Sequence, residues 1–295
     1  MSRTQEAQTT ASTHRSRTLL VSFLGAVVRK MGGWMPIGAT VELLAQSGLD
    51  ASSVRTAVFR LKKRGWLESE SRSGVRGYAL TATALEALAA GDQVIWHARQ
   101  PADLRDGWCL VNFSVPESAR AKRHQLTAHL TSLGFGNTGS AVWIAPARML
   151  PAAQAIIAEL NLSGQCAVFV GHYAAGQDLT SLVRNGWDID EIDRRYKEFI
   201  DAYEPEADRL ARAPFIEGKQ ALITYLAVID HWRKLPFRDP GLPLEVLTET
   251  WSGSAAVHLF ERLVAILEGR ALAHAAPHWP SRSPSDASGA AGQAG

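Results

Sequence analysis

Cysteine is nearly absent from this chain of 295 residues, which has only Cys109 and Cys166. The two do not form a Cys-x-x-Cys pair, and two thiols cannot make the multiple cross-links that hold small secreted domains together. Both lie in apolar runs, where cysteine packs as a small core residue. The sequence therefore favours a reducing compartment, and we expect a cytoplasmic protein without structural disulfides.

Long apolar runs are missing as well. The stretch Leu19–Val28 follows a basic segment, as the centre of a signal peptide does. However, Arg29 and Lys30 come directly after it, and no small-x-small cleavage site intervenes. The stretch is also shorter than the roughly 20 residues that a membrane-spanning helix needs. We expect neither secretion nor insertion into a membrane.

Signatures of catalysis are equally scarce. The sequence contains no Gly-x-Ser-x-Gly, no phosphate-binding P-loop and no His-Glu-x-x-His. His124 and His129 have a spacing that does not place them on one helix face, and the remaining histidines are scattered. Because zinc sites gather their ligands closely, we expect no metal, no cofactor and no enzymatic activity.

Charge is distributed unevenly, although the whole chain carries a net charge of only +2. Residues 1–90 contain 12 Lys and Arg against 6 Asp and Glu, a net +6. Residues 91–295 contain 19 against 23, a net −4. A basic N-terminal part followed by an acidic remainder indicates that the N-terminal part contacts a polyanion. Chance together with a basic tail is the alternative explanation.

Changes in composition and helix- or strand-breaking residues divide the chain into segments. Both ends are rich in small and polar residues, which is typical of disordered tails. The expected segments are a disordered tail at 1–15, a first domain at 16–100, a middle domain at 107–174, a helical C-terminal domain at 178–275 and a disordered tail at 277–295.

The first domain has the element order of a winged helix-turn-helix, namely three helices, a β-hairpin and a further helix. Helices are predicted over residues 18–30, 36–46, 51–64 and 82–98. Strands are predicted over residues 34–35, 66–71 and 78–80, with a turn over 72–77. Asp50 is placed to cap the third helix and Thr81 the fourth.

The third helix carries the candidate DNA contacts. Val54, Val58 and Leu61 form an inward stripe, so the polar residues face outward. A recognition helix lies in the major groove with its N-terminal residues at base edges, where Arg can bond guanine and Ser or Thr can bond bases or phosphates. The expected contacts are Ser52, Ser53, Arg55, Thr56, Arg60 and Lys63. Cations at the end of a helix also suit its negative pole, so a structural role for Lys63 stays open.

Two more candidate contacts, Arg72 and Arg76, flank Gly74 in the predicted hairpin turn. Guanidinium groups on such a turn can enter a minor groove or hold the DNA backbone. The alternative is a turn that is simply solvated.

The middle domain is predicted to follow the β-α-β-β-α-β order of a ferredoxin-like fold. Strands are expected over residues 108–115, 140–145 and 166–172, and helices over 117–133 and 149–160. The pattern needs one further short strand, for which residues 134–138 are available. The C-terminal domain is expected to be all-helical, with helices over 215–233, 243–250 and 255–272 and an amphipathic stripe at Ile192, Tyr196, Phe199, Ile200 and Tyr203. The predicted fold class is therefore α+β with several domains.

Several runs along the chain carry a family resemblance. They are Leu19–Gly25, Leu49–Leu61, Arg64–Leu67, Phe113–Glu117, Leu133–Gly136, Trp143–Pro146, Asp230–Arg233 and Phe237–Pro243, followed by Trp251. In this order the chain resembles the PaaX family of phenylacetate-catabolism repressors over nearly all of residues 17–272. No single motif decides the matter, but the order of the motifs is specific.

This resemblance implies a winged helix-turn-helix, a ferredoxin-like middle domain and a helical C-terminal domain. It also implies a homodimeric repressor that binds operator DNA and is released by an aryl-CoA thioester such as phenylacetyl-CoA. Composition and spacing alone lead only to a DNA-binding regulator, so the effector is an expectation taken from the family.

An aryl-CoA needs an apolar slot for its ring and cations for its phosphates. The aromatic candidates are Trp187, Tyr225 and Trp232, and the candidate donors are His172, Arg184, His231 and Arg233. Aromatic stripes at helical spacing are usually core, so a core role is the equal alternative.

Two other functions remain open at this point, and the first is a metal-dependent nuclease with a winged-helix DNA-binding front. The middle domain also resembles small CRISPR-associated nucleases, which carry an Asp at the end of the first strand. The corresponding run, Asn112–Pro116, has no acid, so we interpret the domain as a scaffold. The second alternative is a DNA-binding regulator whose rear serves only protein contacts.

Overall fold

The described part of the chain combines helices with two antiparallel sheets. The computed structural model describes residues 16–95, 100–139, 141–235 and 239–280. The tail predicted over residues 1–15 lies outside the described residues. The mixed helix and strand content agrees with the predicted α+β class. Among the helices that are described, none has the length and hydropathy that crossing a bilayer requires.

Contacts between Cα atoms divide the chain into two units, each assembled from separate segments. Of the described residues, the first unit takes those from Ser16 to Gly91, then Tyr203–His231, and those from Leu259 to Pro280. The second unit takes Asp92–Ala202 and Trp232–His258. Helices of the predicted C-terminal domain are thus shared between the two units. The three consecutive domains therefore stay an interpretation of the sequence order.

The N-terminal part of the first unit alternates helices with a small sheet. Residues 16–23 are α-helical and continue into a π-helical turn, η1 (Leu24–Val28). The next helices are α2 (Ile37–Gln46), α3 (Ala51–Lys63) and α4 (Ala82–Ile95), and the strands are β1 (Trp34–Pro36), β2 (Leu67–Arg72) and β3 (Val75–Leu80). The sheet has the antiparallel order β1-β3-β2. The predicted succession of three helices, a hairpin and a fourth helix is confirmed.

The second half of the chain supplies three long helices, α8 (Ile189–Arg212), α9 (Gly218–Trp232) and α10 (Gly253–Ala275). Along α8 the predicted stripe buries Tyr196 and Phe199 fully. The helix predicted over residues 243–250 is wrong, because only a 3-10 turn forms at Leu244–Val246. Leu247 adopts an extended backbone after that turn, and the threonines that follow have low helix propensity.

Helices α9 and α10 complete the first unit by bonding to its N-terminal elements. Ser22 Oγ donates a hydrogen bond to the Asp230 carboxylate at 3.0 Å. Lys30 forms an ion pair with Glu268, and the Tyr225 hydroxyl donates to the same carboxylate at 2.7 Å. The C-terminal helices are therefore part of the packing around the N-terminal elements.

The predicted start of the C-terminal disordered tail, residue 277, lies too early in the chain. A 3-10 turn covers Ala276–His278 (η6), and the Trp279 indole N–H donates to the Trp34 carbonyl at 2.7 Å. The Trp279 ring also lies against Phe23, with centroids 6.4 Å apart. A large indole can bury its body and satisfy its N–H at once, which composition did not reveal. Residues 281–295 lie outside the described residues.

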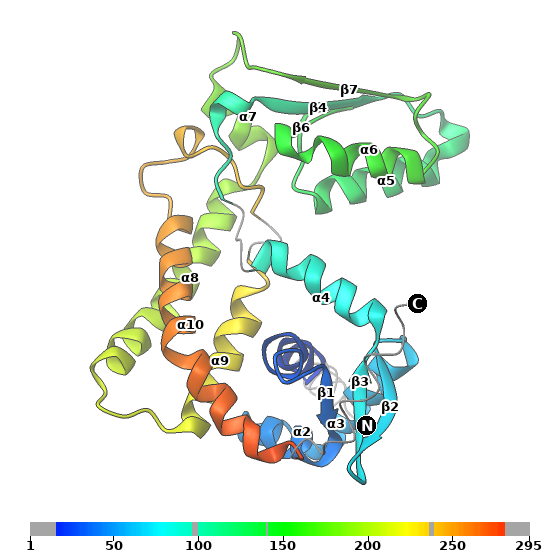
Figure 1. Cartoon of the computed structure of the whole chain (residues 1–295). Coiled ribbons are helices and arrows are strands. Elements are labelled where there is room, and N and C mark those ends of the chain that lie inside the picture. The colour runs from blue at the N-terminus through cyan, green and yellow to red at the C-terminus, as the bar shows by residue number, and fades with distance from the viewer. Residues whose placement is uncertain (1–15, 96–99, 140, 236–238, 281–295) are drawn as a thin grey trace, which may run out of the picture. The chain divides into compact units, whose positions relative to one another are not determined.

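The middle segment forms a four-stranded sheet with two helices on one face (Figure 1). Its elements are β4 (Trp108–Phe113), α5 (Arg120–Ser132), β5 (Gly136–Gly139), β6 (Val142–Pro146), α6 (Leu150–Glu159) and β7 (Cys166–Gly171). The antiparallel order is β5-β6-β4-β7, so β7 is an edge strand. The extra strand that the pattern required is present at Gly136–Gly139. Short 3-10 turns lie at Leu104–Asp106 (η2), Glu117–Ala119 (η3), Ala147–Met149 (η4) and Leu244–Val246 (η5).

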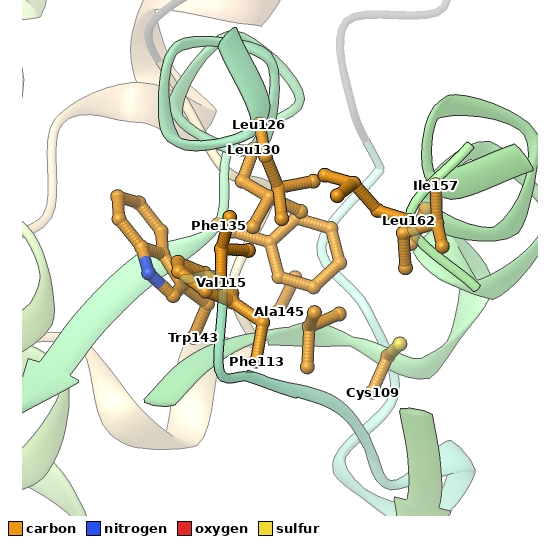
Figure 2. Close-up of a cluster of buried hydrophobic side chains, with 12 residues drawn as sticks. Cys109, Phe113, Val115, Leu126, Leu130, Phe135, Trp143, Ala145, Ile157 and Leu162 are labelled. Atoms are coloured by element: carbon orange, nitrogen blue, oxygen red, sulfur yellow. The ribbon is translucent and has the colours of Figure 1, made fainter. Parts of the chain in front are cut away.

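Alternating side chains of this sheet face α5 and α6 and form one apolar core (Figure 2). Phe113 and Trp143 come from the strands, Leu126 and Leu130 from α5, and Ile157 from α6. Cys109 is fully buried beside them, and burial raises the pKa of its thiol to about 11. The prediction that cysteine serves as a core residue is confirmed for Cys109, whereas Cys166 is half-buried.

The opposite face of the same sheet is covered by a second cluster. Trp108 and Ile144 of the sheet pack with Trp187 and with Val183 of α7 (Leu179–Gly186). This cluster explains why Trp187, which directly follows α7, is buried, and it bears on the predicted role of that residue in ligand binding.

Gly77 should be intolerant of a side chain because it lies against β1. A Cβ atom there would be 2.4 Å from the Met35 carbonyl oxygen and 2.4 Å from the Trp34 ring. We expect Gly77→Ala to lower the free energy of unfolding by about 1–3 kcal/mol, the usual cost of overpacking. In α2, a Cβ on Gly38 would meet nothing within 4 Å, so Gly38→Ala should raise stability by about 0.5–1 kcal/mol. Urea unfolding of both variants is the measurement, and effects of the same sign would contradict this account of Gly77.

Candidate nucleic-acid interface

Helix α3 begins at a side-chain cap. The Asp50 carboxylate accepts a hydrogen bond from the Ser53 backbone N–H at 2.8 Å, as predicted for this residue. The Ser52 hydroxyl donates to the same carboxylate at 2.7 Å. These hydrogen bonds from Ser53 and Ser52 hold the pKa of Asp50 well below its usual range. The cap therefore stays charged at neutral pH, and both serines contribute to it.

One face of α3 is buried in the first unit. Val54, Val58 and Leu61 are at most 3% exposed, which confirms the predicted inward stripe, and Ala57 joins them. The opposite face consists of exposed side chains that are mostly polar or cationic. They are Ser52, Arg55, Thr56, Phe59, Arg60, Lys62 and Lys63.

The cations of this face differ in what they already contact. Lys62 Nζ donates to the Ser69 hydroxyl at 2.8 Å and lies 6.0 Å from the Tyr78 ring, so it joins α3 to the hairpin. Lys63 Nζ lies 5.2 Å from the Phe59 ring centroid. Within the described ranges, Arg55 and Arg60 form no ion pair. These two guanidinium groups are consequently available to an outside anion.

The hairpin beside α3 turns more tightly than predicted. Its turn has only two residues, Ser73 and Gly74, both with positive φ (48° and 77°). Such two-residue turns match the twist of paired strands. The predicted turn over 72–77 is therefore wrong, since Arg72 ends β2 and Arg76 lies in β3 opposite Ser71.

This difference separates the roles of the two hairpin arginines. Arg72 Nε donates to the Glu70 carboxylate at 2.6 Å, and the guanidinium lies 5.3 Å from the Trp34 ring centroid. Arg76 is exposed and has no ion pair in the described part of the chain. Arg76 is thus the hairpin cation that can contact a ligand without breaking an internal bond.

Taken together, residues 51–80 carry seven Lys and Arg and two Glu, a net +5. The cations lie on a helix whose other face is buried and on the adjacent hairpin. A cationic surface that presents a helix and a β-hairpin side by side is suited to the phosphates and grooves of a nucleic acid.

The aromatic residues predicted to line a ligand slot are core residues. Trp187 donates its indole N–H to the Gly134 carbonyl at 3.0 Å. Trp232 donates to the Ile95 carbonyl at 2.8 Å and is fully buried, as is Tyr225. Burial and the Glu268 carboxylate raise the pKa of the Tyr225 hydroxyl far above its usual range. The alternative stated for these aromatics, a role in the core, is therefore the one that their burial and satisfied polar atoms favour.

The predicted donors are divided between the two units. Arg184 is exposed on α7, and Arg233 is half-buried after α9. The His231 ring lies 5.6 Å from the Tyr203 ring within the first unit, and His172 belongs to the second. The ligand set as a whole remains a prediction.

One predicted ligand residue, His172, lines an apolar pocket of about 270 Å³ in the second unit. The pocket lies between the end of the edge strand β7 and α7. Its other lining residues are Trp108, Leu110, Ile144, Phe169, Val170, Gly171, Tyr173, Ala174, Leu179 and Leu182. The structure thus brings His172 to a pocket whose remaining residues were not predicted as a site.

Exposed apolar residues are the feature that sequence reasoning missed. Phe59 is 57% exposed on α3, while Phe169 and Val170 of β7 are 60% and 50% exposed. Phe59 falls outside the inward stripe of α3, so helical spacing could have identified it. The exposure of β7 depends on its edge position, which the sequence pattern does not show.

The geometry defines a protein with a basic helix and hairpin directed outward, and comparisons with known proteins agree with this class. Residues 15–84 match the model of the PaaX-like protein, residues 101–183 the PaaX protein central Cas2-like domain, and residues 187–277 the PaaX-like protein C-terminal domain. The chain belongs to the PaaX family.

One curated relative illustrates this membership. The chain is 27% identical over 255 residues to the "Transcriptional repressor PaaX" of Escherichia coli (strain K12), covering 83% of this chain and 79% of that protein. It is also similar to a solved structure, "Uncharacterized protein Rv0674 from Mycobacterium tuberculosis", with a TM-score of 0.57 and 17% identity over 88% of this chain and 98% of the other. At that identity the second likeness concerns the fold alone.

Proposed function

We propose that this protein is a cytoplasmic, DNA-binding transcriptional repressor of phenylacetate-type catabolic genes and not an enzyme. The observation that carries the proposal is the capped helix α3, whose exposed arginines lie beside a basic hairpin. Membership of the PaaX family and the repressor name of the Escherichia coli relative support the same role.

The element orders support a finer reading of the fold. The first unit's helices and its β1-β3-β2 sheet have the order of a winged helix-turn-helix, with α3 as recognition helix and the β2–β3 hairpin as wing. The middle sheet, with two helices on one face and the order β5-β6-β4-β7, has the topology of a ferredoxin-like domain. The run at the end of its first strand, Asn112–Pro116, has no acid, whereas the CRISPR-associated nucleases carry an Asp there.

Arg55 is proposed to read a base. It is exposed on the first turns of α3, where a recognition helix approaches base edges. Arg55→Ala should weaken binding to the preferred site by about 1–3 kcal/mol and relax specificity at one base pair. Binding to a panel of single-base variants of the site is the measurement. Equal weakening on every sequence would contradict base reading and would indicate a phosphate contact, which is the role we propose for Arg60.

The wing contact is expected to involve Arg76 rather than Arg72. Arg76→Ala should reduce the slope of log K against log salt by about 0.9, the contribution of one phosphate contact. Arg72→Ala is the matched control, since Arg72 is held by Glu70 and Trp34. It should leave the slope nearly unchanged. Equal changes in both variants would show that the Arg72–Glu70 pair opens on DNA.

A homodimer is part of the proposal, because two recognition helices read two half-sites about 34–36 Å apart or a multiple of that. The edge strand β7 supports this part. It pairs only with β4, so its other side is unpaired in the described sheet, and it exposes Phe169 and Val170. An unpaired apolar edge is a template for pairing with a second chain.

The proposed effector is phenylacetyl-CoA or a related aryl-CoA thioester. The support is family membership, and the residues that would hold the effector are the predicted set His172, Arg184, Trp187, Tyr225, His231, Trp232 and Arg233. In that set, Trp187, Tyr225 and Trp232 can contribute only if the core that now buries them rearranges.

One experiment separates the proposal from its two alternatives. Electrophoresis of the protein with the DNA upstream of its own gene should show a protein–DNA complex that dissociates when phenylacetyl-CoA is added. A complex that no acyl-CoA affects would favour a regulator without a small-molecule effector. Cleavage of the DNA on addition of a divalent cation would favour a nuclease, although the described residues hold no cluster of three His, Cys, Asp or Glu side chains.

A further inference from the structure

Phe59 is an apolar side chain in an otherwise polar setting. Its ring is 57% exposed at the centre of the outward face of α3. Leaving a large aromatic side chain in water forgoes the stabilisation that burying it would bring. Neither capping nor the packing of α3 explains the ring, because the buried stripe is complete without it.

The neighbours of Phe59 are the residues proposed to contact DNA. On a helix, residues three and four apart lie next to one another, so Arg55, Thr56 and Lys63 surround the ring. Lys63 Nζ lies 5.2 Å from the ring centroid, a distance at which a cation is attracted to the π face of the ring. Phe59 stays 57% exposed beside these residues despite the contact with Lys63.

We propose that Phe59 packs against the C5-methyl group of a thymine in the major groove and so determines specificity at that position. This inference rests on the proposed function. In the major groove the apolar group that a base presents is the thymine methyl. An aromatic ring placed between base-contacting residues therefore has one apolar partner available, and Lys63 above it is placed for the adjacent phosphate.

The test removes that methyl group alone. A site bound by the protein is first located by footprinting the DNA upstream of its gene. Each thymine in it is then replaced singly by deoxyuridine. Wild-type binding should weaken roughly fourfold at one thymine of each half-site, which is the fold-change corresponding to about 0.8 kcal/mol for one buried carbon group. Phe59→Ala should bind the thymine and deoxyuridine sites equally.

Two variants serve as controls. Phe59→Leu keeps an apolar contact and should retain part of the preference for thymine. Phe215→Ala removes an even more exposed phenylalanine, 79% exposed and outside α3, and should leave the preference intact. Circular dichroism and sedimentation of Phe59→Ala should match the wild type.

The outcomes separate the inference from the proposed function. Failure to bind any duplex would overturn the proposed function and this inference with it. Binding with no thymine-methyl dependence, or with the same dependence in Phe59→Ala, would overturn the role of Phe59 alone. A change in oligomeric state in Phe59→Ala would instead assign the ring to a protein contact and would also overturn the inference.

Discussion

Phenylacetyl-CoA is expected to release the protein from its operator, and this is the largest effect that we predict. A ligand shifts an equilibrium only by its differential affinity for the two states. Moving a repressor from nearly all bound to nearly all free requires about 10⁴-fold preference for the DNA-incompetent state, or roughly 5.5 kcal/mol. In a dimer, two sites could each supply about half of that energy.

Calorimetry with four ligands tests this prediction. Phenylacetyl-CoA should bind much more tightly than phenylacetate, CoA or acetyl-CoA. Only the aryl thioester offers both an aryl ring for an apolar slot and phosphates for cations. Acetyl-CoA is the matched control, since it keeps the phosphates and lacks the ring. If phenylacetate alone binds as tightly as its thioester, the hypothesis that the protein recognises the CoA part is wrong.

Placing a charge on the edge of the middle sheet is the second large effect. Phe169 is 60% exposed on β7, whose outer side is unpaired in the described sheet. If two copies meet there, Phe169→Glu removes an apolar contact from each copy and brings two like charges together. Each of the two rings contributes about 1.5–3 kcal/mol of burial. Losing both should raise the dissociation constant of the dimer by at least about 100-fold.

Sedimentation at micromolar concentration measures this change, and binding to a two-half-site operator should weaken with it. Phe215→Glu is the matched control, because Phe215 is also a strongly exposed phenylalanine but does not lie on β7. It should leave the dimer intact. A dimer that survives Phe169→Glu unchanged would place the interface elsewhere, and a wild-type monomer that occupies DNA as single chains would remove the dimer from the proposal.

The sequence by itself determined the features that arise within one turn or one strand. Asp50 caps α3 because a carboxylate before a helix can reach the N–H of the third residue. Val54, Val58 and Leu61 point inward because they repeat at helical spacing. The order of elements followed from the same local periodicities, together with the breaks that separate them.

Sequence reasoning failed where the outcome depended on residues far away in the chain. Arg72 was expected in the hairpin turn, but it lies in a strand and its guanidinium packs against the distant Trp34 ring. Trp279 was assigned to a tail, yet it bonds to Trp34. Such contacts join segments separated by many residues, and no local pattern encodes them.

Only the tertiary structure decided which apolar residues are core and which are surface. Phe199 and Trp232 are fully buried, whereas Phe59 and Phe169 are exposed, although all four are large and aromatic. Their residue type sets how much free energy burial can provide, but burial itself requires another segment to cover the ring. The core role of Trp187 and Tyr225 and the exposure of Phe169 on β7 therefore became visible only once the packed elements were in place, whereas helical spacing already leaves Phe59 outside the inward stripe of α3.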